Sequence, residues 1–197
     1  MPKTIKKINM RELSLHILDI VQNSVRADAS MIIIDIEADF VKDYLTIRIT
    51  DNGKGMDKET LKKVTDAFTT TRKTRKVGMG IPLFKMAAES SGGEFDISSK
   101  EGMGTVVKAG FKISSIDRVP LGEMEETMTT LISGSPEKDF IMNYRIVTED
   151  EEREFNFDTR EIKEEIEDIP IDDYEIVSTI RSYIKENIKA TNGGLVL

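Results

Sequence analysis

The chain has 197 residues, of which 39% are hydrophobic and 32% charged, with a single histidine and neither cysteine nor tryptophan. This composition indicates a folded globular chain that is long enough to bury a core, and it excludes disulfides, thiolate chemistry and a metal site built from several histidines. The net charge of −8 is unevenly spread, because residues 1–113 carry +4 and residues 114–197 carry −12, and this break predicts two units with different roles.

The first half of the chain alternates between helical and strand patterns. Apolar residues at helical spacing predict helices over residues 11–27, 57–67 and 82–90, and β-branched runs predict strands over residues 31–38, 44–50, 94–99 and 105–113. The segment 69–76 is polar and basic without periodicity, so we expect a loop there. This order predicts an α/β sandwich in which one layer of helices covers a sheet.

The second half is predicted to form a smaller, acidic α+β domain. A helix is expected over residues 121–132, a hairpin over 140–148 and 153–157, a short helix opening at Asp158, and a last helix capped by Asp172 or Asp173. We therefore divide the chain into a domain of residues 1–113 and an acidic domain of residues 114–197.

The first predicted helix carries a polar face. Glu12, His16, Asp19, Asn23 and Arg26 follow one another at helical spacing, opposite the apolar residues. An asparagine oxygen is a hard neutral ligand that suits Mg²⁺ shared with substrate phosphates. A carboxylate one turn earlier can orient a water or hydroxyl nucleophile, and an arginine one turn later can meet phosphate oxygens. The chain has no P-loop motif, and its glycines do not have the Rossmann spacing.

Five short motifs occur in order along the first half. They are Asp19-Ile-Val-Gln-Asn23-Ser-Val-Arg26, Asp51-Asn-Gly53-Lys-Gly55-Met56, Phe68-Thr-Thr-Thr, Gly78-Met-Gly80-Ile-Pro-Leu83 and Glu101-Gly102-Met-Gly104-Thr105. This series resembles the N box, first glycine box, lid motif, second glycine box and closing Gly-Thr of the GHKL ATPases, the superfamily of gyrase, a heat-shock chaperone, histidine kinases and MutL. The resemblance covers residues 11–113 and implies a Bergerat-type α+β fold, with a helical layer on a mixed sheet.

The resemblance also implies an ATP site with Mg²⁺. Asp51 would accept a hydrogen bond from the adenine amino group, assisted by Thr105, and Asn23 would hold the Mg²⁺ that bridges the phosphates. The backbone around Gly53, Gly55 and Met56 would approach the base and ribose.

The phosphates would lie near the second glycine box and the lid. Backbone N–H groups around Gly78, Met79 and Gly80 would face them at a helix N-terminus, where anions are favoured. Arg26 would contact phosphate oxygens, and a basic lid would close over the triphosphate through Arg72, Lys73, Arg75 and Lys76.

Asp19 is the candidate catalytic residue, and it departs from the superfamily pattern. The hydrolytic branches place a glutamate there, whereas histidine kinases place an asparagine there and a lysine at the position of Arg26. The aspartate is shorter by one methylene, so we expect ATP turnover to be slow or absent without a partner. His16, one turn earlier, has three open interpretations: it orients or acidifies Asp19, it accepts phosphate, or it is a surface histidine near the site.

Three functions stay open from the sequence. The chain is a regulatory ATP-binding protein that phosphorylates a protein partner, as the anti-sigma-factor kinases do; an ATPase in which the nucleotide closes the lid or drives dimerisation; or a non-catalytic ATP sensor. We expect a protein partner, reached through residues 114–197, and leave a homodimer open. No nucleic acid or membrane partner is expected, because the second half is acidic and no apolar run can span a bilayer. The N-terminus lacks the apolar stretch of a secretory signal, and a cytoplasmic location is expected.

Overall fold

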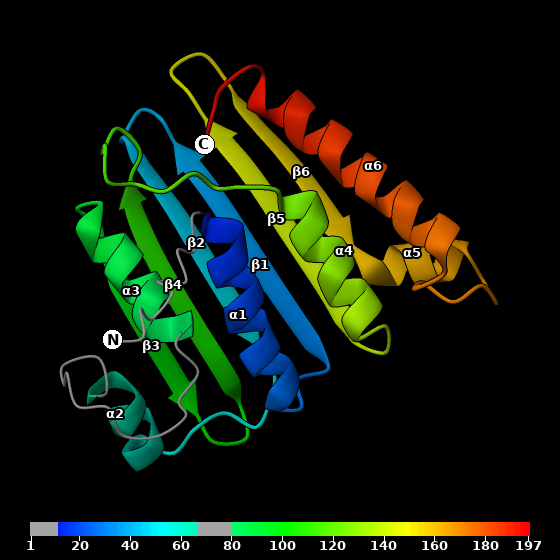
Figure 1. Cartoon of the computed structure of the whole chain (residues 1–197), viewed down its shortest axis with the longest axis horizontal. Coiled ribbons are helices and arrows are strands. Elements are labelled where there is room, and N and C mark those ends of the chain that lie inside the picture. Colours follow the sequence, from blue (N-terminus) through cyan, green and yellow to red (C-terminus); the bar gives the residue numbers. More distant parts are fainter. Residues whose placement is uncertain (1–11, 67–79) are drawn as a thin grey trace, which may run out of the picture.

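The computed structural model describes residues 12–66 and 80–197. These residues form six helices and six strands (Figure 1). The helices are α1 (Leu13–Arg26), α2 (Lys58–Asp66), α3 (Gly80–Ser90), α4 (Met124–Gly134), α5 (Thr159–Glu165) and α6 (Tyr174–Asn192). The strands are β1 (Met31–Asp39), β2 (Tyr44–Asp51), β3 (Phe95–Lys100), β4 (Gly104–Lys112), β5 (Asp139–Val147) and β6 (Glu152–Asp158).

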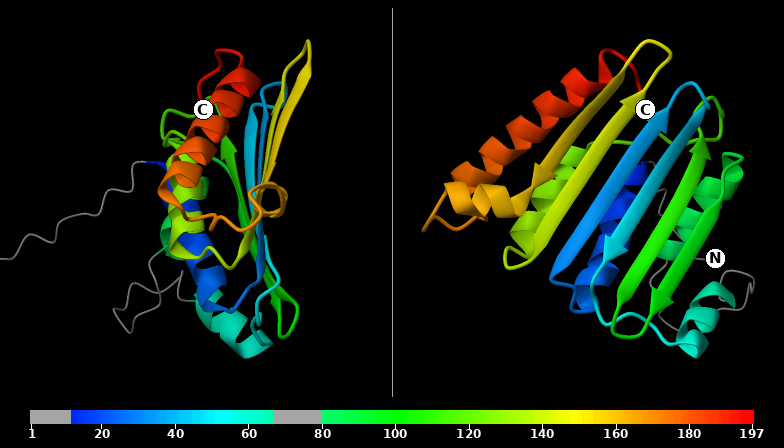
Figure 2. Two further views of the ribbon diagram at one scale, coloured as in Figure 1. Left: turned by 90° about the vertical axis from the view of Figure 1, so that its right-hand side faces the viewer. Right: turned by 180° about the vertical axis from the view of Figure 1, so that it is seen from behind.

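All six strands belong to one mixed sheet, in the order β3-β4-β2-β1-β5-β6. Neighbouring strands run antiparallel, except that β1 and β5 are parallel. Seen edge-on, α1, α3, α4 and α6 lie on one side of this sheet (Figure 2). The predicted sandwich, with a helical layer on a mixed sheet, is confirmed.

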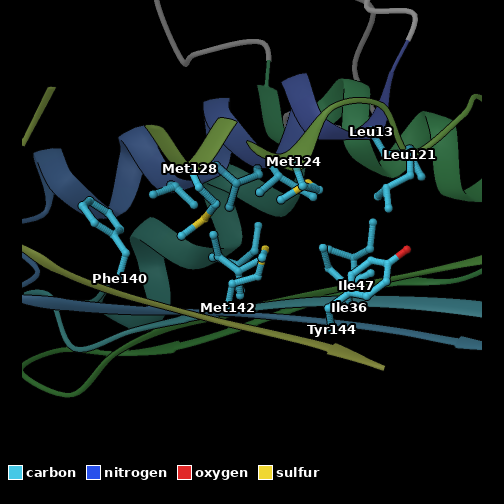
Figure 3. Packing of buried hydrophobic residues seen from close by; sticks show 14 of the residues in the cluster. Leu13, Ile36, Ile47, Leu121, Met124, Met128, Phe140, Met142 and Tyr144 are labelled. Carbon is cyan, nitrogen blue, oxygen red and sulfur yellow. The ribbon is translucent and has the colours of Figure 1, made fainter. Parts of the chain in front are cut away.

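The core lies between the sheet and the helical layer. Buried and half-buried residues alternate along β1 and β5, as expected for strands with one face on a core. Figure 3 shows the side chains of Leu13, Met124 and Met128 from the helices above Ile36 and Met142 from the strands. All five are at most 1% exposed, so α1 and α4 pack on the same stretch of sheet.

The separate second domain predicted from the charge break is corrected by this topology. β5 pairs with β1 from Met31 opposite Asp139 to Asp39 opposite Val147. The second half therefore extends the sheet of the first half and shares one hydrophobic cluster with it. The charge break reflects which side chains face solvent and not where a core ends.

The second half also anchors the start of α1. The first N–H groups of a helix have no partner within the helix. Here the N–H groups of Leu13 and Ser14 donate to the carbonyls of Pro120 and Leu121, at 2.9 and 2.7 Å. The connection from β4 to α4 thus holds the helix that carries the N box.

Most predicted helices and strands begin and end within three residues of the observed ones, and aspartates cap three of the helices as predicted. Asp57 accepts from the backbone N–H of Thr60 at 2.7 Å, just before α2. Asp158 caps α5, and Asp173 rather than Asp172 caps α6.

Among the described helices, none combines the length and the apolar character that crossing a membrane requires.

Candidate functional site

A cavity of about 220 Å³ lies between α1 and the ends of β2 and β4. Apolar side chains from several elements form most of its wall, with a few polar groups among them. Its lining residues are Ile20, Asn23, Ser24, Ala27, Asp51, Lys54, Gly55, Met56, Val64, Ile81, Ile97, Thr105 and Val107. Ligand sites commonly combine apolar walls with a few convergent polar groups, and the N box, first glycine box and closing Gly-Thr all contribute to this one.

The carboxylate of Asp51 is the most constrained polar group of the cavity. The residue is 8% exposed at the end of β2. Its Oδ2 accepts a 2.6 Å hydrogen bond from the Ser24 hydroxyl, and its Oδ1 accepts from the N–H groups of Gly53 at 2.9 Å and Thr105 at 3.2 Å. An ionised carboxylate has about four acceptor sites, so Oδ2 keeps capacity for one further donor.

Two serines of this network were missed from the sequence. Helical spacing places Ser24 on the apolar face of α1, in line with Ile17 and Ile20, yet its hydroxyl faces Asp51. Ser99 joins three segments: its hydroxyl accepts from the Met56 N–H at 2.9 Å, lies 2.9 Å from the Thr105 hydroxyl, and donates to the Gly104 carbonyl at 3.0 Å. A hydroxyl inside an otherwise apolar helix stripe was the available signal for Ser24, because such a group needs a partner when buried.

Gly55 and Gly80 allow segments to approach more closely than a side chain would permit. Gly55 has φ +63°, and a Cβ there would lie 2.0 Å from the Lys100 carbonyl oxygen. Gly80 is the first residue of α3, and a Cβ there would lie 2.8 Å from the Cβ of Asp19. The start of α3 is therefore in direct contact with the candidate catalytic residue.

The N-box residues lie together along α1 beside the cavity. Asn23 lines the cavity, and its Oδ1 accepts a 2.9 Å hydrogen bond from the exposed Arg26 guanidinium. Asp19 is half-buried, one turn earlier. The structure therefore places Asp19 against Gly80, and Asn23 in one cavity lining with Ile81 of α3, and Arg26 is joined to them through Asn23.

His16 is buried, so the surface-histidine interpretation is wrong. The side chain is 3% exposed, and its ring stacks on Phe84 of α3, with centroids 5.7 Å apart. The phosphate-acceptor interpretation also fails on access, because so buried a ring is not presented to a donor phosphate. Burial lowers the pKa of His16 below its usual value, and the nearby Asp19 carboxylate opposes this by a smaller amount.

The sequence profile described as "Histidine kinase-, DNA gyrase B-, and HSP90-like ATPase" matches residues 9–115. The chain belongs to this family.

Several curated sensor proteins are similar to part of this ATPase-family chain. An NtrY-like sensor histidine kinase of Rickettsia conorii is 30% identical over 84 residues, which are 43% of this chain and 14% of that protein. The sensor protein DegM of a Bacillus species is 30% identical over 99 residues, 50% of this chain and 26% of that protein. The chain thus spans only a small part of the length of these relatives.

Among solved structures, the MutL ATPase domain of Aquifex aeolicus complexed with ADP aligns with 68% of this chain and 60% of that chain. The sequence identity is 16% and the TM-score 0.42.

Some predicted site residues of this ATPase-family chain lie outside the described residues. These are Lys76, Gly78 and Met79, together with Arg72, Lys73 and Arg75 of the basic lid. Within residues 12–66 and 80–197, no cluster of three or more histidine, aspartate or glutamate side chains could hold a metal ion. A divalent cation here would depend on Asn23, on water and on ligand oxygens.

Proposed function

We propose that the chain binds Mg-ATP, with the adenine base in the cavity beside Asp51. The observation that carries this proposal is the buried Asp51 carboxylate, which three protein donors orient while one acceptor site on Oδ2 stays available. An adenine amino group is a donor of the matching kind. Membership of the ATPase family supports the same ligand.

The size and lining of the cavity suit a base. Sites for drug-sized ligands usually measure about 300–1,000 Å³, and a cavity of about 220 Å³ offers room for one planar ring system. Ile20, Ile97 and Val107 offer the apolar walls that such a ring system needs. The ribose and phosphates would extend toward Asn23 and the start of α3.

The donor set beside the cavity fits a magnesium triphosphate. Mg²⁺ prefers oxygen ligands and keeps several waters, so the one amide oxygen of Asn23 together with phosphate oxygens is a sufficient anchor. That oxygen is engaged by Arg26. We propose that Arg26 turns onto the phosphates when the cation binds, which frees Asn23 Oδ1 and gives the guanidinium an anionic partner.

We propose that the bound ATP serves regulation of a protein partner, by phosphoryl transfer or by conformational change, and not rapid hydrolysis. Asp19 stands where the hydrolytic branches of the resemblance carry the longer glutamate. Its carboxylate packs against Gly80, so the backbone of α3 limits how far the side chain can move toward a bound phosphate. A partner would use the exposed acidic surface of residues 114–197.

Calorimetric titration with Mg-ATP tests the site through the Asp51→Asn variant. An amide at this position presents an N–H to the adenine amino group and weakens a charge-assisted hydrogen bond worth roughly 1.5–3 kcal/mol, so affinity should fall by about 10- to 150-fold. Asp96→Asn, at an exposed position on β3, is the matched control and should bind like the native chain. Unchanged affinity in Asp51→Asn would overturn the site assignment.

The use of the nucleotide is tested with γ-labelled ATP and a cell extract. Transfer to a partner gives a labelled protein band, whereas hydrolysis releases labelled phosphate. The Asp51→Asn chain controls for kinases of the extract itself. Phosphate release without a labelled band would contradict the phosphoryl-transfer form of the proposal.

A further inference from the structure

His16, the only histidine of the chain, has a place in the fold that ATP binding does not explain. Its imidazole is 3% exposed, and within the described part of the chain its Nδ1 has no hydrogen-bond partner. Buried polar atoms are usually satisfied, and an unsatisfied one in a native structure calls for an explanation. The ring lies one helical turn from Asp19 on α1, so the two side chains are neighbours.

Two successive contacts join α1 to α3 at this point. Asp19 lies against Gly80 at the start of α3, and the His16 ring stacks on Phe84, one turn further along, at an interplanar angle of 23°. Phe84 is itself held by Phe95 and Phe111 of the sheet, with centroids 6.3 and 5.7 Å away. The packing of α1 on α3 therefore sets the positions of both His16 and Asp19, and the contacts of Phe84 with the sheet hold α3 in place.

Among residues 12–66 and 80–197, Asp19 is the charged group that acts on the His16 ring. On α1, Glu12 lies near Ser14 and Gly122 instead. The charged side chains of the packed helices α3 and α4 pair with others: Lys85 with Glu89, Glu125 with Lys185, and Glu126 with Arg181. On β2 and β4, Arg48 and Lys108 are exposed between buried neighbours, on the face of the sheet away from α1, and Lys112 is exposed as well. The buried Asp51 of β2 accepts from Ser24, about two helical turns from His16.

We propose that His16 is a positioning residue that makes the action of Asp19 on the bound nucleotide depend on pH. The neutral ring packs on Phe84 and leaves the Asp19 carboxylate at the start of α3. When a proton from solvent binds the ring, the imidazolium attracts that carboxylate back along α1 and away from the nucleotide. A displacement of about 1 Å can cost roughly 10²-fold in rate, so this movement is enough to switch turnover off. The inference rests on the proposed function, because it assumes that Asp19 faces a bound triphosphate.

The direction of the switch follows from the surroundings of the ring. Burial lowers the pKa of His16, and the attraction to Asp19 only partly restores it. The neutral, active form therefore prevails at pH 7, and the inactive form gains population as the pH falls below the ordinary histidine value of about 6.5.

The first test is an NMR titration of the full chain without nucleotide. A single histidine gives ring ¹⁵N signals that need no assignment, so the titration reports His16 directly. We expect a midpoint below 6.5 in the native chain and a further fall of about 0.5–1 unit in Asp19→Asn, because this variant removes the carboxylate that favours the imidazolium. A midpoint that Asp19→Asn leaves in place would overturn the coupling.

The second test compares labelled-phosphate release or transfer at pH 8 and pH 5.5 under single-turnover conditions. We expect the native rate to fall at least 10-fold between these pH values and the His16→Phe rate to fall less than 3-fold, since phenylalanine keeps the stacked ring but cannot bind a proton. Mg-ATP affinity, measured by calorimetry at both pH values, should change equally in the two chains. Parallel rate losses in the native chain and His16→Phe would contradict the proposal.

The two proposals fail in different ways. If ATP does not bind, calorimetry shows it while the His16–Asp19 coupling in the NMR titration can still be measured. If ATP binds but the titration midpoint of His16 is the same in the native chain and in Asp19→Asn, the nucleotide site stands and the proposed role of His16 is wrong. Thermal unfolding at pH 8 checks that both variants are folded.

Discussion

The hydroxyl of Ser24 and the carboxylate of Asp51 join the middle of the helical layer to the sheet through a 2.6 Å hydrogen bond. Both residues are buried, at 4% and 8% exposure. Ser24 donates to Oδ2, the oxygen that keeps one acceptor site for a further donor, so Ser24 orients the carboxylate that we assign to adenine recognition. A bond of this kind, from a neutral donor to a charged acceptor in a buried site, is stronger than one between neutral groups.

The Ser24→Ala variant should therefore weaken Mg-ATP binding. Loss of the hydroxyl leaves Asp51 Oδ2 without its protein donor and costs about 1.5–3 kcal/mol, equivalent to roughly 10- to 150-fold in affinity if the whole cost falls on the bound state. Calorimetry at fixed Mg²⁺ measures the change. Ser182→Ala, at an exposed position on α6 where the hydroxyl donates to the Ser178 carbonyl, is the matched control and should be neutral.

The contrast between Ser24 and Asn23 shows what the sequence could and could not predict. Asn23 was predicted because its neighbours form a recognisable motif. Ser24 was missed because helical periodicity assigns a residue to a face of a helix but does not identify the residue it meets there. Its partner lies 27 positions away, and only the packing of α1 on β2 brings the two together.

The domain boundary failed for a related physical reason. The β-branched run Ile32-Ile33-Ile34 in β1 predicts a strand, and its side chains alternate between buried and half-buried in the structure, so the run does not indicate how many strands pair with β1. The change in net charge after residue 113 suggested the boundary, but net charge describes the surface and not the pairing of strands. The parallel pairing of β1 with β5 connects segments more than a hundred residues apart, and no local pattern specifies that partner.

Asn23 and Arg26 should have separable effects on ligand binding. Asn23→Ala should abolish the dependence of ATP affinity on Mg²⁺, since it removes the amide oxygen assigned to the cation. Arg26→Ala should lower ATP affinity but leave adenosine affinity in place, because Arg26 does not line the base cavity. Titrations with ATP and with adenosine, each with Mg²⁺ and with a chelator, distinguish the two roles. If Arg26→Ala lowered adenosine affinity as much as ATP affinity, the assignment of Arg26 to phosphate would be contradicted.

Asp19→Ala should retain ATP binding and lose turnover. The side chain lies beside Gly80 and not in the base cavity, so its removal affects only the reacting end of the nucleotide. Affinity within a factor of about 3 of the native chain and a rate loss of at least 10-fold are expected, the latter from general-base contributions of about 10²–10⁴. Calorimetry and labelled-phosphate release give the two values, and an unchanged rate would show that Asp19 is only structural.

The stability of the chain should decrease as the pH falls from about 6.5 toward 5. The pKa of His16 is lowered in the folded state, so the unfolded chain binds the proton first and gains population below the unfolded value of about 6.5. Carboxylates such as Asp39 and Asp158, whose pKa values are lowered by hydrogen bonds from Lys42 and Arg160, lose their stabilising effect only when the pH falls below about 3.9.

Urea unfolding at pH 7.5, 6 and 5 measures this dependence. The native midpoint should fall over this range, and the midpoint of His16→Phe should stay nearly constant, because that variant has no group with the histidine pKa. A native urea midpoint that does not change between pH 7.5 and 5 would mean that His16 has the same pKa in the folded and the unfolded chain.

A chain ended after Ile113 should not form the native fold. Truncation removes β5 from β1 along nine paired positions, removes the carbonyls that accept from Leu13 and Ser14, and exposes apolar surface that α4 and β5 cover. An exposed hydrophobic strand edge is an aggregation site, so we expect a poorly soluble chain without a cooperative thermal transition. Circular dichroism of residues 1–113 and of the full chain, melted side by side, makes the comparison. Cooperative unfolding of the truncated chain at the midpoint of the full chain would contradict this prediction. It would show that residues 1–113 fold alone and that β5, β6 and α4 are not needed for their stability.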